Sequence, residues 1–183
     1  MVVQAINPII RLHQHRNRVN HKLCAFAIEL TNEQRHQSFG IGQGSVWKTL
    51  LHMMGAEYVW LETIVGDANP TMPGDLPTGL VGNQRGENGI RTMDQLLECW
   101  TDLESRWNNY LEDLQHVDLN QLIPKISTSS HFGQRKATSL MDILLHVCTH
   151  AHYTAAQVIN MLRQLGIVEL PDPMLITMAR DET

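Results

Sequence analysis

The sequence has 183 residues, with 19 acidic residues against 14 Lys and Arg, so its formal net charge is −5 at pH 7. This balance argues against general nucleic-acid binding, which usually needs a basic domain, and no apolar run approaches membrane-spanning length. The length fits one domain over residues 1–183 with its own core. Cys24, Cys99 and Cys148 lie far apart in helix-like patterns, which indicates reduced, buried thiols of a cytoplasmic protein.

The first helix is expected over about residues 5–31, because apolar residues recur there at spacings of three and four. This apolar stripe comprises Ile9, Leu12, Val19, Leu23, Phe26 and Leu30. Arg16 falls on the stripe, so its side chain either snorkels to water or reaches a polar pocket inside the protein. The stretch from Arg11 to Lys22 is basic and contains no acid, which we interpret as a solvated helix face.

The second helix is expected over about residues 45–65, with Ser45 as its N-cap. It is apolar nearly all round, which predicts burial on two sides, one against the core and one against a partner subunit. His52 lies among small residues such as Gly55, which leave room around the ring. Glu57 is one of the few polar residues that relieve the apolar surface.

The segments between the helices carry turn residues. Residues 31–43 are expected as a connector, and residues 66–91, rich in Gly, Pro, Asn and Asp, as a long loop. The glycines of this loop match no phosphate-binding motif. A capping box from Thr92 to Gln95 predicts a third helix over about residues 92–114. Short β-like pieces within residues 119–137 predict a hairpin before the last helix.

The fourth helix is expected over about residues 139–165, capped by Thr138 or Ser139 and stopped by Gly166. His146 and His150 are four residues apart on one face, a spacing at which two imidazoles can chelate a divalent metal. His152 projects about 200° away from His150. The remaining histidines are expected to be surface or structural residues: His13, His15, His21, His36, His116 and His131.

Four long amphipathic patterns with few strands predict an all-α fold built as a helical bundle. If the second and fourth helices pack against each other, His52 meets His146 and His150.

Several motifs occur together, in a shared order and at suitable separations. They are residues 45–57 with Trp60, residues 145–150 followed by Gln157, residues 162–166 and residues 170–173. With these motifs the chain resembles the DinB-like superfamily over nearly its whole length. The resemblance implies an up-down-down-up four-helix bundle, which is often a homodimer.

The resemblance also implies a Ni²⁺ or Zn²⁺ site made by three histidines. One comes from the second helix and matches His52, and two come from the fourth helix, where the expected positions are His150 and Thr154. Since a neutral hydroxyl is a poor ligand for these metals, three outcomes are open. The site is lost or very weak, it is rebuilt with His146 as the third ligand, or two histidines are completed by water and an acid such as Glu57.

Two functions follow from the resemblance. As an enzyme, the chain is similar to metal-dependent transferases and isomerases that use low-molecular-weight thiols. His52 and His150 would then be metal ligands, His146 a third ligand or general base, and Arg16 a partner for an anionic substrate group. As a binding module, it is a dimeric bundle without metal that holds a small ligand or a partner protein. The sequence leaves open whether it is an enzyme, and no nucleic-acid or membrane partner is expected.

Overall fold

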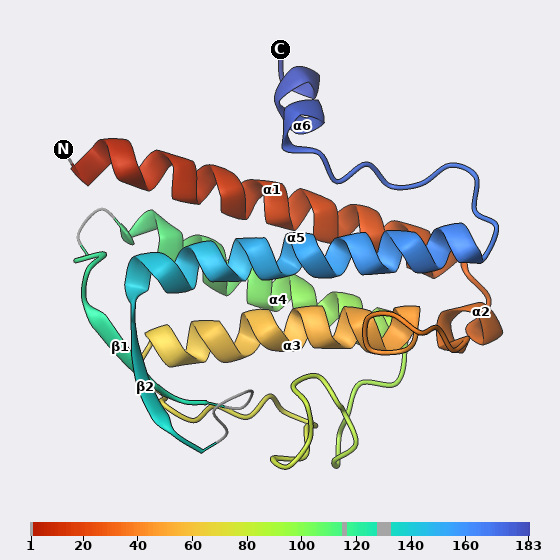
Figure 1. Cartoon of the computed structure of the whole chain (residues 1–183), viewed down its shortest axis with the longest axis horizontal. Helices are drawn as coiled ribbons and strands as arrows, with labels where there is room; N and C mark the ends of the chain where they lie inside the picture. Colours follow the sequence, from red (N-terminus) through yellow and green to blue (C-terminus); the bar gives the residue numbers. More distant parts are fainter. Residues whose placement is uncertain (1, 115–116, 128–132) are drawn as a thin grey trace.

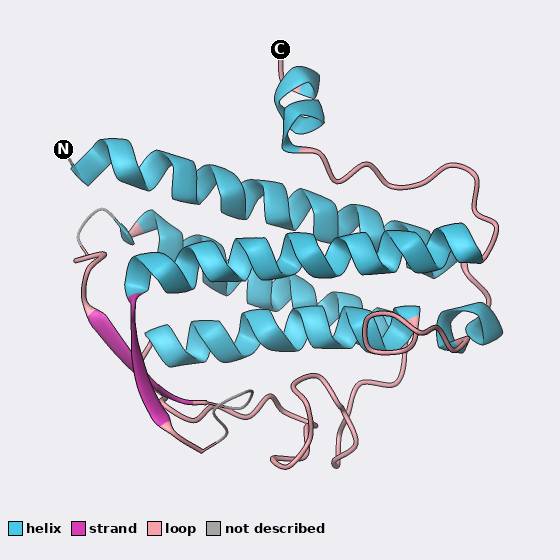
Figure 2. Cartoon of the chain, in the orientation of Figure 1, coloured by secondary structure: helices cyan, strands magenta, loops and turns pink. Residues whose placement is uncertain are grey.

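The computed structural model describes residues 2–114, 117–127 and 133–183, with side chains from Pro8 onward, and is mostly helical (Figures 1 and 2). The described residues form six helices and one two-stranded sheet. In chain order the elements are α1 (Val2–Glu29), α2 (Asn32–His36), α3 (Val46–Ile64), α4 (Met93–Glu112), β1 (Leu122–Ile126), β2 (Arg135–Ser139), α5 (Leu140–Gln164) and α6 (Leu175–Asp181).

The four long helices lie side by side around a common core. Figure 1 shows that α1 and α5 run in one direction and that α3 and α4 run in the other. Helix α5 packs on α1 and on α3, and α4 closes the far side against the same two helices. The largest fully buried side chains come from all four: Leu23, Leu50, Met54, Leu96, Trp107, Ile143 and Leu144.

Helices α3, α4 and α5 begin where the sequence predicts, because their caps are encoded locally. The Ser45 side chain accepts a hydrogen bond from the Lys48 N–H, and Ser139 caps α5 in the same way. Thr92 and Gln95 form the predicted capping box of α4. The two short helices α2 and α6 were not predicted. Helix α2 nevertheless opens on a capping box of its own, formed by Thr31 and Gln34.

The predicted hairpin is present and leads directly into α5. Strands β1 and β2 pair antiparallel, from Leu122 opposite Ser139 to Ile126 opposite Arg135. Ser139 is both the last residue of β2 and the N-cap of α5. The Leu140 N–H at the start of the helix donates to the Gln121 carbonyl, so the hairpin and the helix are joined without a linker.

The long loop between α3 and α4 folds back onto α3. Gly82, with a φ of +80°, packs so closely on the helix that a Cβ there would lie 2.7 Å from the His52 Cα and collide with the Leu51 carbonyl. A Cβ on Gly55 would in turn lie 2.8 Å from the Gly82 nitrogen. At this point, therefore, the chain's own loop covers the face of α3 that carries Gly55.

The basic stretch of α1 is not the solvated face expected from the sequence. His13, His15 and Arg16 are all buried. Arg11 pairs with Glu182 at 2.5 Å and Arg18 pairs with Asp181. The acids that balance this stretch come from the C-terminal end of the chain, more than 160 residues away in sequence, which is why the local pattern does not reveal them.

Two of the three cysteines are buried as expected, and Cys99 is exposed. Cys99 precedes Trp100, which lies on the apolar stripe of α4, so its own side chain turns toward solvent. No helix among the described residues is long and apolar enough to cross a membrane.

Candidate functional site

Helices α3 and α5 bring the three predicted histidines into one cluster. The ring centroids of His52 and His150 are 5.2 Å apart with an edge-to-face tilt of 69°, and those of His146 and His150 are 5.8 Å apart. His52 and His150 are partly buried between the helices, and His146 is exposed. The packing of α3 on α5, inferred from two separate helix patterns, therefore places the histidines in contact.

The long loop fixes the orientation of His52. Its Nδ1 lies 3.0 Å from the Val81 carbonyl oxygen. A carbonyl oxygen only accepts hydrogen bonds, so Nδ1 carries the proton and Nε2 keeps a free lone pair. Histidines that ligate a metal are typically held by this kind of bond from the opposite ring nitrogen. The arrangement prepares His52 to bind through Nε2.

His150 is neutral over the physiological pH range. Burial between the helices, followed by the neighbouring His52 and His146, lowers the pKa of His150 to about 4. Partial desolvation also lowers the pKa of His146. Only the neutral imidazole has a lone pair for a metal ion. Protons therefore compete weakly for these two rings at neutral pH.

Trp60 of α3 forms one wall of the cluster beside His146. The ring centroids of Trp60 and His146 are 5.3 Å apart with an interplanar angle of 74°. The Lys125 ammonium of β1 lies 5.4 Å from the Trp60 ring centroid. Trp60 thus links the histidines to the hairpin through an edge-to-face contact and a cation–π contact.

Thr154, at the position where the resemblance implies a third ligand, uses its hydroxyl for the backbone. Its Oγ1 donates to the His150 carbonyl at 2.8 Å, and the residue is only 2% exposed. Hydroxyls of Ser and Thr inside helices often bond back in this way. Thr154 therefore closes the helical turn that carries His150.

The pair of His52 and His150 fits a divalent metal better than the set of three does. Two imidazoles bound to one tetrahedral Zn²⁺ at about 2.0–2.1 Å would have ring centroids about 5 Å apart, which matches their separation. In the part of the chain that the structure describes, no three His, Cys, Asp or Glu side chains are arranged to hold one ion. His146 is the neighbouring imidazole, in ring contact with His150.

The model of the DinB family matches residues 1–182. The chain belongs to the DinB family. A search of curated proteins gave no match. In this DinB chain, His52 lies on α3 and His150 on α5, and Thr154 follows one turn further along α5.

The DinB core also contains a buried ion pair between the two other predicted pocket residues. The Arg16 Nε lies 3.5 Å from Glu57 Oε2, and both residues are 2% exposed. Glu57 Oε1 accepts from Asn20 at 2.7 Å, and Oε2 accepts from the Trp100 indole at 3.3 Å. The Arg16 side chain thus points into the protein and does not extend to water. Glu57 is buried, so it does not provide the polar surface on α3 that the sequence suggested.

His13 extends this polar cluster toward α5. Its Nε2 lies 3.2 Å from the Leu144 carbonyl, and Arg16 Nη1 donates to its Nδ1 at 2.9 Å. Burial, with the Arg16 charge second, holds the pKa of His13 well below its usual range. Sequence reasoning missed this cluster. The spacing of His13, Arg16 and Asn20, three and four residues apart, was the available signal for a polar stripe.

The other histidines that the structure describes on α1 and α2 also have polar partners. His15 Nε2 contacts the Pro173 carbonyl at 2.7 Å, His21 pairs with Glu104 at 2.6 Å, and His36 bonds to the Asn32 carbonyl. His116 and His131 lie outside the described residues.

Proposed function

We propose that this DinB protein is an up-down-down-up four-helix bundle that binds Ni²⁺ or Zn²⁺ through His52 and His150, with His146 as third ligand. Its activity would be a transfer or isomerisation that uses a small thiol. The observation that carries the proposal is the contact between His52 and His150 at a centroid distance of 5.2 Å. The directions of the four long helices and the family match support the bundle.

The chemistry of the donors supports a transition metal. His52 is oriented by the Val81 carbonyl, and the pKa of His150 is low enough to keep the ring neutral at pH 7. A bound divalent ion would lower the pKa of a coordinated thiol or water, which supplies a nucleophile at neutral pH. The protein's own part is to keep the His150 imidazole neutral and to hold His52, the α3 ligand, in a fixed orientation through the loop.

His146 has two roles open to it under this proposal. It contacts His150 and Trp60 and is exposed, so a modest turn of its side chain would bring it toward the ion as a ligand. If water or substrate takes that position, the lowered pKa of His146 suits a general base. The anion-binding role suggested for Arg16 is not favoured, because Glu57 already neutralises its charge inside the core.

A metal-free binding module is the second candidate, and one observation favours it. The hydroxyl at the inherited third-ligand position is engaged by the His150 carbonyl. For either candidate we propose a homodimer from the resemblance alone. The α3 face at Gly55 does not form its interface, because the loop occupies that face.

Metal loading of the purified full chain tests the proposal. Tag-free protein is incubated with Ni²⁺ or Zn²⁺, dialysed and measured by plasma mass spectrometry, with His52→Ala, His150→Ala and His21→Ala in parallel. We expect near-stoichiometric metal in the parent and in the His21→Ala control, because His21 lies on exposed α1 surface beside Glu104. Either α3 or α5 substitution should lower affinity by at least about tenfold. A parent that takes up no metal would favour the binding module.

A further inference from the structure

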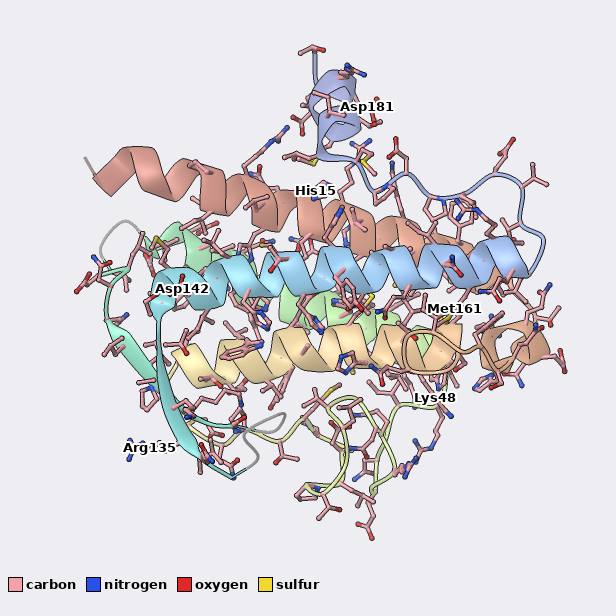
Figure 3. The ribbon with its side chains drawn as sticks, viewed as in Figure 1. His15, Lys48, Arg135, Asp142, Met161 and Asp181 are labelled. Atoms are coloured by element: carbon pink, nitrogen blue, oxygen red, sulfur yellow. The ribbon has the colours of Figure 1, made fainter. Side chains whose placement is uncertain are left out.

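A second hollow lies on the face of α5 turned away from the histidine cluster. It is a groove of about 660 Å³ between α1, α5 and the segment that leads into α6. Leu12 and His15 line it from α1, Cys148, His152 and Tyr153 from α5, and Met174 from the C-terminal segment. Figure 3 shows His15 on the side of α1 where that segment passes, and its ring contacts the Pro173 carbonyl.

The walls of this groove are mainly apolar and open to solvent. Tyr153 is 68% exposed, and Met174 and Ile176 are also exposed. The size falls within the roughly 300–1,000 Å³ that is usual for small-molecule sites. The groove is concave, between α1, α5 and the segment that leads into α6, so it can hold a small ligand with an apolar chain.

A small polar chamber adjoins the groove. It has a volume of about 10 Å³, and Arg16, Asn20 and Ala151 line it. His15, Cys148 and His152 line both the chamber and the groove, so the two hollows are neighbours. A volume of this size holds about one water-sized group, which corresponds to a single hydroxyl.

One buried acceptor at the chamber lacks a partner. The Asn20 amide nitrogen donates to the Glu57 carboxylate at 2.7 Å, which fixes the side-chain orientation. The other end, Oδ1, has no hydrogen-bond partner among the described residues, although Asn20 is only 4% exposed. A buried acceptor without a donor is costly. A donor that enters from the groove would relieve that cost.

The charge of the surrounding cluster selects among donors. Arg16 and Glu57 neutralise each other beside the chamber. A carboxylate head group would bring an unbalanced negative charge and has no proton to donate, and an ammonium head group would bring an unbalanced positive charge. A neutral hydroxyl satisfies Oδ1 without either penalty.

We propose that this groove binds a small molecule with a short apolar body and a neutral hydroxyl, which enters the chamber and donates to Asn20 Oδ1. This site is separate from the histidine cluster and does not depend on a metal.

The test compares three probes that share one apolar chain. The full-length protein is titrated with 1-hexanol, hexanoate and hexylammonium, and binding is followed by backbone amide shifts in two-dimensional NMR. We expect 1-hexanol to bind at least about tenfold more tightly than either charged probe, with shifts centred on Cys148, His152 and Met174. Asn20 also borders a hollow between α1 and α4. The amide shifts of α5 and of the C-terminal segment, and not that of Asn20, therefore show which of the two hollows the probe occupies.

Two matched substitutions on α5 locate the site. Ala156 lines the groove and is exposed, so Ala156→Trp should fill it and weaken 1-hexanol binding by at least about tenfold. Gln164→Trp, also exposed on α5 but outside the groove, should bind as the parent does. Equal affinities for 1-hexanol and hexanoate would overturn the proposal. So would shifts confined to the hollow between α1 and α4, or a dimer in solution that Ala156→Trp abolishes.

Discussion

At the scale of single residues, Thr154 stands at the position where the resemblance implies a third histidine ligand. Position 154 lies one turn beyond His150 on α5, and its hydroxyl is spent on the His150 carbonyl. The same residue is buried, so its side chain points into the protein and not to water. Replacing the side chain at position 154 therefore tests the metal site most directly.

Thr154→His should raise Ni²⁺ or Zn²⁺ affinity by at least about tenfold, which corresponds to about 1.4 kcal/mol. An imidazole is a far better ligand than a hydroxyl for these ions. Isothermal titration calorimetry on the parent and the variant measures the change, with exposed Thr149→His on the same helix as control. The larger side chain should cost about 1–3 kcal/mol of stability in the metal-free protein. An unchanged affinity would mean that position 154 does not face His52 and His150.

At the scale of elements, the long loop does more than connect α3 to α4. Its Val81 carbonyl fixes His52, and the neighbouring Gly82 allows the loop to approach the helix backbone. A site built from helices alone would leave the α3 ligand free to rotate. The loop thus belongs to the candidate site although it contributes no side chain to it.

Gly82→Ala should therefore weaken metal binding without touching a histidine. The added Cβ collides with the Leu51 carbonyl, and the positive φ disfavours any side chain. The loop should withdraw, and the loss of this supporting bond is expected to lower affinity about 10–100-fold. Imidazole nitrogen NMR of His52 in metal-free protein reads the change directly. Gly40→Ala, where a Cβ meets nothing within 4 Å, is the control. A His52 spectrum identical to that of the parent would contradict this role for the loop.

At the scale of the whole molecule, the interior is held by a polar cluster as well as by apolar packing. Glu57 of α3 joins Arg16 and Asn20 of α1 to Trp100 of α4, and His13 continues the cluster to the backbone of α5. All four long helices meet in this cluster. Its members are buried, so the state of one group affects the stability of the entire fold.

Stability should fall as the pH drops below about 6.5, and His13 should account for part of the loss. The pKa of folded His13 is well below the usual 6.5, because burial and the nearby Arg16 charge disfavour its protonated form. Above pH 6.5 both states are neutral at this residue. Below it, the unfolded chain takes up a proton that the folded chain excludes, so unfolding is favoured. His15, His146 and His150 act in the same direction.

Urea unfolding of the parent and of His13→Gln at pH 7 and pH 5 isolates the contribution of this residue. Glutamine does not titrate, so the variant should lose less free energy of unfolding between the two pH values than the parent does. Arg16 of the same helix, Trp107 of α4 and the Leu144 carbonyl of α5 surround the His13 ring in the parent, and the same groups face position 13 in the variant. Equal losses in parent and variant would exclude His13 as a contributor.

How far the sequence predicts this molecule depends on the range of the interaction. Ser45 and Thr92 mark helix starts because capping is local, and the spacing of His146 and His150 places both on one helical face. The fate of Arg16 was undecided, since its partner Glu57 comes from another helix and has the appearance of a surface residue. The hydrogen bond that orients His52 goes to a backbone carbonyl, that of Val81. Every residue type has this group, so no residue type in the sequence indicates the bond.

The junction at Ser139 couples strand register to helix phase. A strand that ends on the N-cap of a helix leaves no residue to absorb a slip, so the pairing of β2 with β1 sets the rotation of α5 about its own axis. A slip of one residue would turn α5 by about 100°, enough to take His150 away from His52. The register of the hairpin therefore decides which histidine of α5 faces α3 and which faces the groove.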